Sequence, residues 1–295
     1  MRTVTSLIVA ATAAGFALCA PAAATPPTPP RAVHEYVALG DSWAADATLT
    51  GITTQFVPLL CVQSATSYAK QVAAALGVTR FRDVSCASAV TANLTSPQQL
   101  PDGRVAPPQF DQLSATTDLV TLEIGGNDAG LAAIVPTCLT GSAQGSHCAH
   151  VRGGTEDAMS ASIRAAEPKV TAAIAGVRAR APHARLLLVD YMAGVSPGTG
   201  CFPQIPISAD DANWLGHKLL ELDAMLARVA TTTGVQLVDT YTGSIGHDAC
   251  RPDGIRWVEG LIPHPNPHSN IPLPFHPNQL GADHQARQIL RALGR

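Results

Sequence analysis

Short apolar runs alternate along the chain with longer segments of helical periodicity. Runs rich in aliphatic and aromatic residues at 33–39, 118–124, 185–190 and 235–239 predict strands, and a further short strand is predicted at 80–84. The run at 185–190 is almost continuously apolar, which is typical of a parallel strand buried on both faces.

Between these strands, apolar residues recur with the spacing of one helix face. Helices are predicted at 65–76, 155–180 and 208–232, and a last helix is predicted to begin near Pro277, a residue suited to a first turn. Ser208 can cap the third of these helices, because a serine oxygen accepts hydrogen bonds from the free N–H groups of a first turn.

Strands that alternate with helices imply right-handed crossovers between parallel strands. We therefore predict an α/β fold, a three-layer α/β/α sandwich with a parallel sheet of about five strands. Ligands of such sheets bind beyond the carboxyl ends of the strands. The segment 243–274 is long, is rich in Pro, Gly and His and lacks periodicity, and loops of this length are usually either functional or disordered.

The first residues have the layout of a secretory signal peptide. Arg2 precedes an apolar run, and the small residues at 22–24 offer a cleavage site. The alternative, a membrane anchor, is disfavoured because the run is short for a span. We assign residues 1–24 to the signal peptide, 25–31 to a Pro-rich leader and 32–295 to one folded domain, and we expect an extracellular protein without a stable membrane anchor.

The charge content narrows the range of partners. Charged residues make up 14% of the chain and the net charge is -3. Phosphate binding requires clustered Lys and Arg, so nucleic acid is not an expected partner.

The cysteines indicate a disulfide framework. The chain has 7 cysteines, and once Cys19 leaves with the signal an even set remains, which in an exported protein predicts three disulfides. Many pairings are possible, but loop closure and chain order favour Cys61–Cys86, Cys138–Cys148 and Cys201–Cys250. The chain contains no C-x-x-C pair, and we expect neither a metal nor a cofactor.

Three polar motifs stand where strands are predicted to end or a helix to begin. These are Gly40-Asp41-Ser42, Gly125-Gly126-Asn127-Asp128 and His276-Pro277-Asn278. A serine in a tight turn can act as a nucleophile, an asparagine amide can stabilise an oxyanion, and histidine is the commonest general base. Each motif alone is also compatible with an ordinary turn, and the glycine pair does not match a nucleotide-binding pattern.

In this order the motifs resemble the SGNH/GDSL hydrolase family, over residues from about 37 to 295. The resemblance implies a flavodoxin-like fold and acyl transfer by Ser42, with His276 as general base. It also implies an oxyanion hole formed by the backbone N–H groups of Ser42 and Ser88 and the side chain of Asn127. Ser88 stands where the family has glycine, so it must adopt a glycine's backbone geometry.

The residues before His276 depart from the family, which usually carries Asp where this chain has Leu273. Two interpretations stay open. A backbone carbonyl, for which we favour that of Leu273, accepts the hydrogen bond of His276 Nδ1, or a remote acid such as Asp253 or Asp239 does so. The secreted actinobacterial esterases and lipases that the chain resembles include members with such a dyad and three disulfides.

The predicted function is that of a secreted esterase or lipase, a monomer acting on small-molecule or lipid esters. One alternative is a polysaccharide O-acetyl esterase with the same residues, although an aromatic content of 4% mildly disfavours a carbohydrate cleft. The other is a secreted binding protein that keeps the fold without the chemistry, an interpretation suggested by Leu273.

Overall fold

Five parallel strands form the main sheet of this computed structural model, which describes residues 1, 3–4, 32–145, 148, 157–198, 200–264 and 270–295. The strands lie in the order β2-β1-β5-β6-β7. Their bounds are β1 (Glu35–Gly40), β2 (Arg80–Asp83), β5 (Leu119–Glu123), β6 (Arg185–Val189) and β7 (Gln236–Val238). All five predicted strands are present, within one or two residues of their expected ends.

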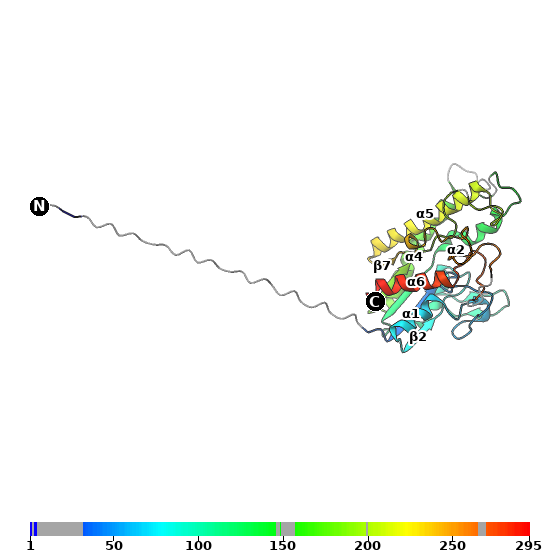
Figure 1. The fold of residues 1–295 in the computed structure, drawn as a ribbon. Coiled ribbons are helices and arrows are strands. Elements are labelled where there is room, and N and C mark those ends of the chain that lie inside the picture. The colour runs from blue at the N-terminus through cyan, green and yellow to red at the C-terminus, as the bar shows by residue number, and fades with distance from the viewer. Residues whose placement is uncertain (2, 5–31, 146–147, 149–156, 199, 265–269) are drawn as a thin grey trace. The chain divides into compact units, whose positions relative to one another are not determined.

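Helices cover both faces of this sheet (Figure 1). One pair, α1 (Tyr68–Leu76) and α6 (Gln279–Ala292), packs together on one face, and α4 (Ala158–Arg180) and α5 (Ala209–Thr233) pack together on the other. The predicted three-layer α/β/α sandwich is confirmed.

The alternation of side chains along the strands produces two apolar cores. On β1, Val37 and Leu39 belong to the core under α4 and α5, whereas Tyr36 and Ala38 belong to the core under α1 and α6. Successive side chains of a strand point to opposite faces, so a strand buried on both faces must be apolar throughout. This requirement explains why the central strands read as continuous apolar runs.

The sheet order determines where a site can form. Numbered along the chain, the parallel strands follow the order 2-1-3-4-5 of flavodoxin-like sheets. In this order the chain leaves β1 toward one edge of the sheet and later returns to β5 on the other side of β1. Ligands bind at such a switch point, beyond the carboxyl ends of the two strands. The Ser42 motif follows β1 and the Asn127 motif follows β5, so both lie at this position.

The capping residue at the N-terminus of α5 was predicted correctly, and the one at the N-terminus of α6 was not. Ser208 caps α5 as expected, because its side chain accepts the N–H of Asp211. The last helix begins at Gln279 rather than near Pro277. Asn278 is its N-cap, since its side chain accepts the N–H groups of the first turn.

Several short elements complete the fold and were not predicted. They are α2 (Gly126–Ala129), α3 (Leu131–Ile134), the two-stranded sheet of β3 (Gln98–Gln99) and β4 (Val105–Ala106), and the 3-10 helices η1 (Leu59–Cys61), η2 (Thr91–Leu94), η3 (Gln109–Gln112), η4 (Val135–Cys138) and η5 (Thr242–Ser244). Such pieces are too short to show a hydrophobic period.

Three disulfides join the predicted pairs, Cys61–Cys86, Cys138–Cys148 and Cys201–Cys250. The first ties η1 to the segment after β2, and the third attaches the long loop after β7 to the segment after β6. Both cross-links therefore constrain loops at the carboxyl end of the sheet.

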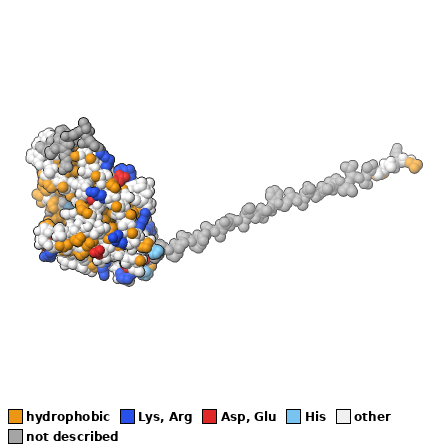
Figure 2. Space-filling model, turned by 180° about the vertical axis from the view of Figure 1, so that it is seen from behind, with side chains coloured by type: hydrophobic (Ala, Val, Ile, Leu, Met, Phe, Trp, Pro, Cys, Tyr) orange, Lys and Arg blue, Asp and Glu red, His pale blue; other side chains and the backbone are white. Residues whose placement is uncertain are grey.

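Most of the expected signal peptide and the whole expected leader lie outside the described residues, and residues 32–295 form one compact unit. Within the described part of the chain, no helix has the length and apolarity that a membrane span requires. On the face shown in Figure 2, Lys and Arg side chains are scattered in small patches, some of them beside Asp or Glu side chains.

Candidate active site

The turn that carries Ser42 is set by Gly40, the last residue of β1. Gly40 has φ 150°, and a Cβ there would lie 2.3 Å from the carbonyl oxygen of Glu123 on the neighbouring strand. Only glycine fits this close approach. The side chain of Asp41 is buried and accepts the N–H of Trp43 at 2.9 Å, which closes the turn around Ser42.

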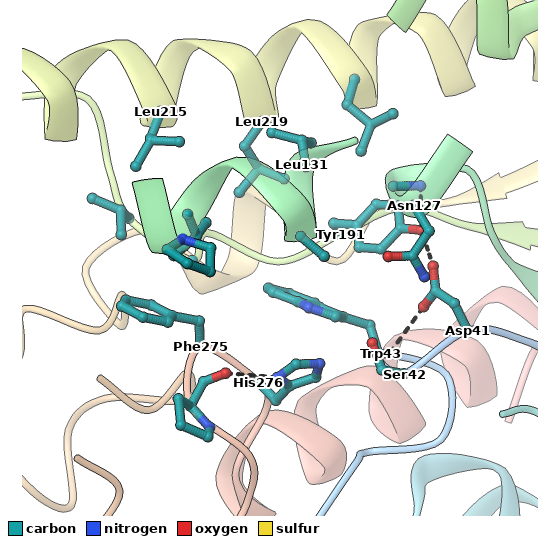
Figure 3. A pocket seen from close by; sticks show the side chains of 18 of the residues that line it. Asp41, Ser42, Trp43, Asn127, Leu131, Tyr191, Leu215, Leu219, Phe275 and His276 are labelled. Atoms are coloured by element: carbon teal, nitrogen blue, oxygen red, sulfur yellow. Dashed lines mark hydrogen bonds between the residues drawn. The ribbon is translucent and has the colours of Figure 1, made fainter. Parts of the chain in front are cut away.

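Ser42, Asn127 and His276 line one cavity of about 400 Å³, although they come from distant parts of the sequence. Ser42 follows β1, Asn127 lies in α2, the next element after β5, and His276 comes from the loop before α6. In Figure 3 the imidazole ring of His276 points toward Ser42. The structure therefore brings together the predicted nucleophile, base and side-chain oxyanion donor.

The imidazole of His276 is held through Nδ1, which lies 2.7 Å from the carbonyl oxygen of Pro274 (Figure 3). A backbone carbonyl is thus the acceptor, as we favoured, but the prediction of Leu273 was wrong by one residue. The Leu273 carbonyl instead accepts the backbone N–H of His276 at 3.2 Å. The Leu273 oxygen is therefore used by the backbone N–H of His276, and the Pro274 oxygen accepts the hydrogen bond from the imidazole ring.

The remote acids proposed as alternatives have other partners. Asp253 pairs with His264 at 2.8 Å and also with Arg256. Asp239 accepts the N–H of Thr242 at 2.8 Å. Neither carboxylate therefore replaces the acid that the family usually places before the histidine.

The other nitrogen of the ring, Nε2, is buried and has no hydrogen-bond partner among the described residues. Burial lowers the pKa of His276 to about 4, against a smaller opposing effect of the Pro274 hydrogen bond. The ring is therefore neutral near pH 7. When Nδ1 carries the proton, as a donor to the carbonyl must, Nε2 keeps a free lone pair.

A buried ion pair anchors the segment that carries His276. The guanidinium Nε of Arg256 lies 2.8 Å from Glu259, and both side chains are almost fully buried. The other carboxylate oxygen of Glu259 accepts from Asn278, and the backbone N–H of Glu259 donates to the carbonyl of His276. The backbone on both sides of His276 is therefore fixed.

Asn127 and Ser88 meet through the residue that follows Ser88. One amide hydrogen of Asn127 is donated to the carbonyl of Ala89 at 2.9 Å, and the amide has a second hydrogen to offer. Ser88 has φ 65°, the left-handed backbone expected of a residue that replaces glycine. Among the described residues, Ser88 does not belong to the set that lines the cavity, so its role as a third oxyanion donor stays a prediction.

Most of the cavity wall is apolar. Leucine side chains of α5, including Leu215 and Leu219, form one side, and Phe275 lies beside His276 (Figure 3). Trp43 contacts the His276 ring with a centroid distance of 6.4 Å and also lines the cavity. Apolar walls with a few convergent polar groups are typical of small-molecule sites.

Sequence reasoning missed Tyr191 as a residue of this site. It is the second residue after β6 and lines the cavity, and its hydroxyl donates to Asp41 at 2.6 Å. Its position at the carboxyl end of a central strand was the available signal, because the same rule had identified Ser42 and Asn127.

No group of three or more His, Cys, Asp or Glu side chains in the described ranges is arranged to hold a metal ion. His268, one of the loop histidines, falls in 265–269 and lies outside those ranges.

The fold and site belong to a known class of ester hydrolases. Residues 38–284 match the GDSL-like Lipase/Acylhydrolase family, and the chain belongs to it. It is accordingly a carboxylic ester hydrolase.

The chain is 37% identical over 284 residues to "Lipase 2" of Streptomyces coelicolor, covering 93% of this chain and 89% of that protein. It is 28% identical to an esterase of Streptomyces scabiei, covering 96% and 92%. Among solved structures, an extracellular lipase of Streptomyces rimosus matches with TM-score 0.66 at 24% identity, covering 88% of this chain and 98% of that chain. A phospholipase A1 of Streptomyces albidoflavus matches with TM-score 0.63 at 23% identity, covering 88% and 99%. These two structures support the fold.

Proposed function

We propose that the protein is a secreted serine esterase or lipase in which His276 activates Ser42 as a dyad. One observation carries this proposal: the buried Nε2 of His276 lacks a hydrogen-bond partner among the described residues, and His276 lines the same cavity as Ser42. A buried nitrogen without a partner is costly in a folded protein. A general base at this position has its lone pair free to accept the hydroxyl proton.

The reaction begins when Nε2 takes the Ser42 proton and Oγ attacks the ester carbonyl carbon. The negative charge that forms on the carbonyl oxygen is stabilised by the Ser42 and Ser88 N–H groups and by the second amide hydrogen of Asn127. The imidazolium then returns the proton to the leaving alcohol, and water cleaves the acyl-enzyme with His276 again as the base. The Pro274 carbonyl keeps the proton of the neutral ring on Nδ1, which is the tautomer that these reaction steps require.

The first test is the substitution Ser42→Ala. The variant should lose hydrolysis of p-nitrophenyl octanoate while its circular dichroism spectrum stays unchanged. Asn127→Ala should retain folding and lower kcat by about 10²–10³-fold, the usual effect of removing one oxyanion donor. Retained turnover in a folded Ser42→Ala protein would show that another group performs the reaction.

The apolar cavity favours an acyl chain over an acetylated carbohydrate as the group that enters it. A sugar has many hydroxyl groups to satisfy, and leucine-lined walls would leave them without partners. We therefore place esters of lipidic or medium-chain acids first and the polysaccharide O-acetyl esterase second. The ratio of kcat/KM for octanoyl and acetyl p-nitrophenyl esters separates the two: a value well above one supports the first, and a value below one supports the second.

Secretion is part of the proposal. It rests on the signal-like residues 1–24, on the three disulfides, which persist in oxidising compartments, and on the similarity to an extracellular lipase. Mass spectrometry of the protein from culture supernatant should find an N-terminus near Thr25. Recovery of the whole chain, from Met1, inside cells only would contradict this assignment.

A further inference from the structure

Tyr191 connects the two turns that carry the reacting groups. Its hydroxyl donates to Oδ2 of Asp41 at 2.6 Å and accepts the backbone N–H of Gly126 at 2.9 Å. Asp41 directly precedes Ser42, and Gly126 directly precedes Asn127. A single oxygen atom therefore links the turn of the nucleophile with the turn of the oxyanion donor.

Tyr191, which makes this link, follows a third strand of the sheet, β6. Ser42 follows β1, Asn127 follows β5 and Tyr191 follows β6, and in the sheet β5 lies between the other two. The backbone N–H of Tyr191 donates to the buried Asp223 of α5 at 3.1 Å, and its ring meets Trp43 edge-on at 5.5 Å. Tyr191 is thus held at its backbone and its ring, so its hydroxyl is a fixed point for the two turns.

The residues around the Tyr191 hydroxyl favour its hydrogen bonds to Asp41 and Gly126. Asp41 is 2% exposed, so its carboxylate depends on protein donors. A Cβ at position 126 would lie 3.1 Å from the Tyr191 oxygen, so a larger residue there would crowd the hydroxyl. A hydrogen bond from a hydroxyl to a carboxylate is among the stronger neutral-to-charged contacts.

We propose that Tyr191 is a positioning residue that sets the distance between Ser42 and the oxyanion donors through Asp41 and Gly126. The inference rests on the proposed function. Oxyanion donors act only when they lie about 2.7–3.1 Å from the developing charge, and a displacement of about 1 Å is costly in rate. Loss of the hydroxyl releases both turns at once. It leaves the ring in place and does not change the apolar walls that bind the substrate.

Tyr191→Phe tests this role, and Tyr36→Phe is the matched control. Tyr36 is also fully buried, and its hydroxyl bonds to Thr121 at 2.8 Å, away from the catalytic turns. Removing either hydroxyl should lower thermal stability. Only Tyr191→Phe should lower kcat for p-nitrophenyl octanoate, by about 10- to 100-fold with KM within about twofold, because the lost interaction acts in the transition state.

A double-mutant cycle with Asp41→Asn tests the route of the effect. If Tyr191 acts through Asp41, the fold-decrease in kcat of the double variant should be smaller than the product of the fold-decreases of the two single variants, because either change breaks the same link. Multiplicative losses would overturn the route through Asp41.

The proposal is overturned if kcat of Tyr191→Phe stays within about twofold of the unaltered enzyme, or if Tyr36→Phe lowers it equally. Ser42→Ala in the same assay separates this failure from a failure of the proposed function, because an inactive Ser42→Ala beside a fully active Tyr191→Phe rejects the positioning role alone. If Tyr191→Phe does not fold, Gly126→Ala crowds the same hydroxyl, because the added Cβ would lie 3.1 Å from its oxygen. It should lower kcat in the same way, and unchanged kcat would reject the role.

Discussion

His276 and Pro274 form the contact that replaces an acid in this site: Nδ1 of the imidazole lies 2.7 Å from the proline carbonyl oxygen. A carbonyl fixes the tautomer as a carboxylate would, but it carries no charge to stabilise the imidazolium. The base is therefore well oriented and weakly basic. Its properties should differ from those of a triad histidine in ways that can be measured.

The pH dependence of kcat/KM should have its acid limb near pH 4. Burial lowers the pKa of His276 to about 4, and the ring is an active base only when neutral. Asp41, whose pKa is raised by its burial to about 6, titrates nearby, so the profile should also be measured in Asp41→Asn, where the His276 limb should remain. A limb near pH 6–7 that persists in Asp41→Asn would contradict a base held by a carbonyl alone.

The same shift has a consequence for stability. The pKa of His276 is lower in the folded protein than its ordinary value of about 6.5, so the unfolded chain binds more protons between these values. The contribution of this group to stability is complete above about pH 6.5 and is lost as the pH falls toward 4. His276→Gln should show a flatter fall in unfolding free energy over this range, in urea titrations at several pH values.

Leu273→Asp should move the activity profile toward that of a triad enzyme. A carboxylate beside the ring stabilises the imidazolium, so the pKa of His276 should rise and the acid limb should shift to higher pH by about one unit or more. Leu273→Asn has the same shape without the charge and should leave the limb in place. Equal profiles for the two variants would show that position 273 does not reach the ring.

Leu215→Phe should shorten the acyl chain that the enzyme accepts. In Figure 3, Leu215 lies farther from Ser42 than Leu219 does, so added volume there should obstruct the distant part of the cavity. We expect kcat/KM for decanoyl esters to fall by about tenfold or more while acetyl esters react as before. A uniform loss for all chain lengths would mean that the acyl chain does not follow α5.

Arg256→Met should destabilise the protein far more than the same change at Arg228. Arg256 and Glu259 are 5% and 6% exposed, so removing the cation leaves a buried charge without compensation and should cost about 3 kcal/mol. Arg228 pairs with Glu167 at 2.9 Å but is 51% exposed, and its loss should cost under about 1 kcal/mol. Urea unfolding measures both, and equal costs would show that the buried pair does not anchor the His276 segment.

The sheet and the three main site residues could be predicted because they depend on patterns that the sequence displays directly. Apolar runs revealed the buried strands, and parallel strands bring their carboxyl ends to one edge, so Ser42 and Asn127 had to meet there. Local capping also determined the end of α5 at Gly234, which has φ 66°.

The acceptor of His276 and the role of Tyr191 could not be predicted in the same way. Which carbonyl faces the ring depends on the turn before it, where Phe275 has φ 59°, an unusual backbone for a phenylalanine. The reach of Tyr191 across β5 depends on side-chain packing between strands that are not neighbours. Neither relationship leaves a period or a spacing in the sequence.

The reactivity of the Ser42 hydroxyl is the property that tests the proposed dyad most directly. A fluorophosphonate reacts only with an activated serine, and peptide mapping by mass spectrometry locates the adduct. We expect stoichiometric labelling at Ser42, no labelling of Ser42→Ala, and much slower labelling of His276→Ala. An adduct on another serine, or an unlabelled but folded protein, would contradict the assignment of Ser42 and His276 as the reacting pair.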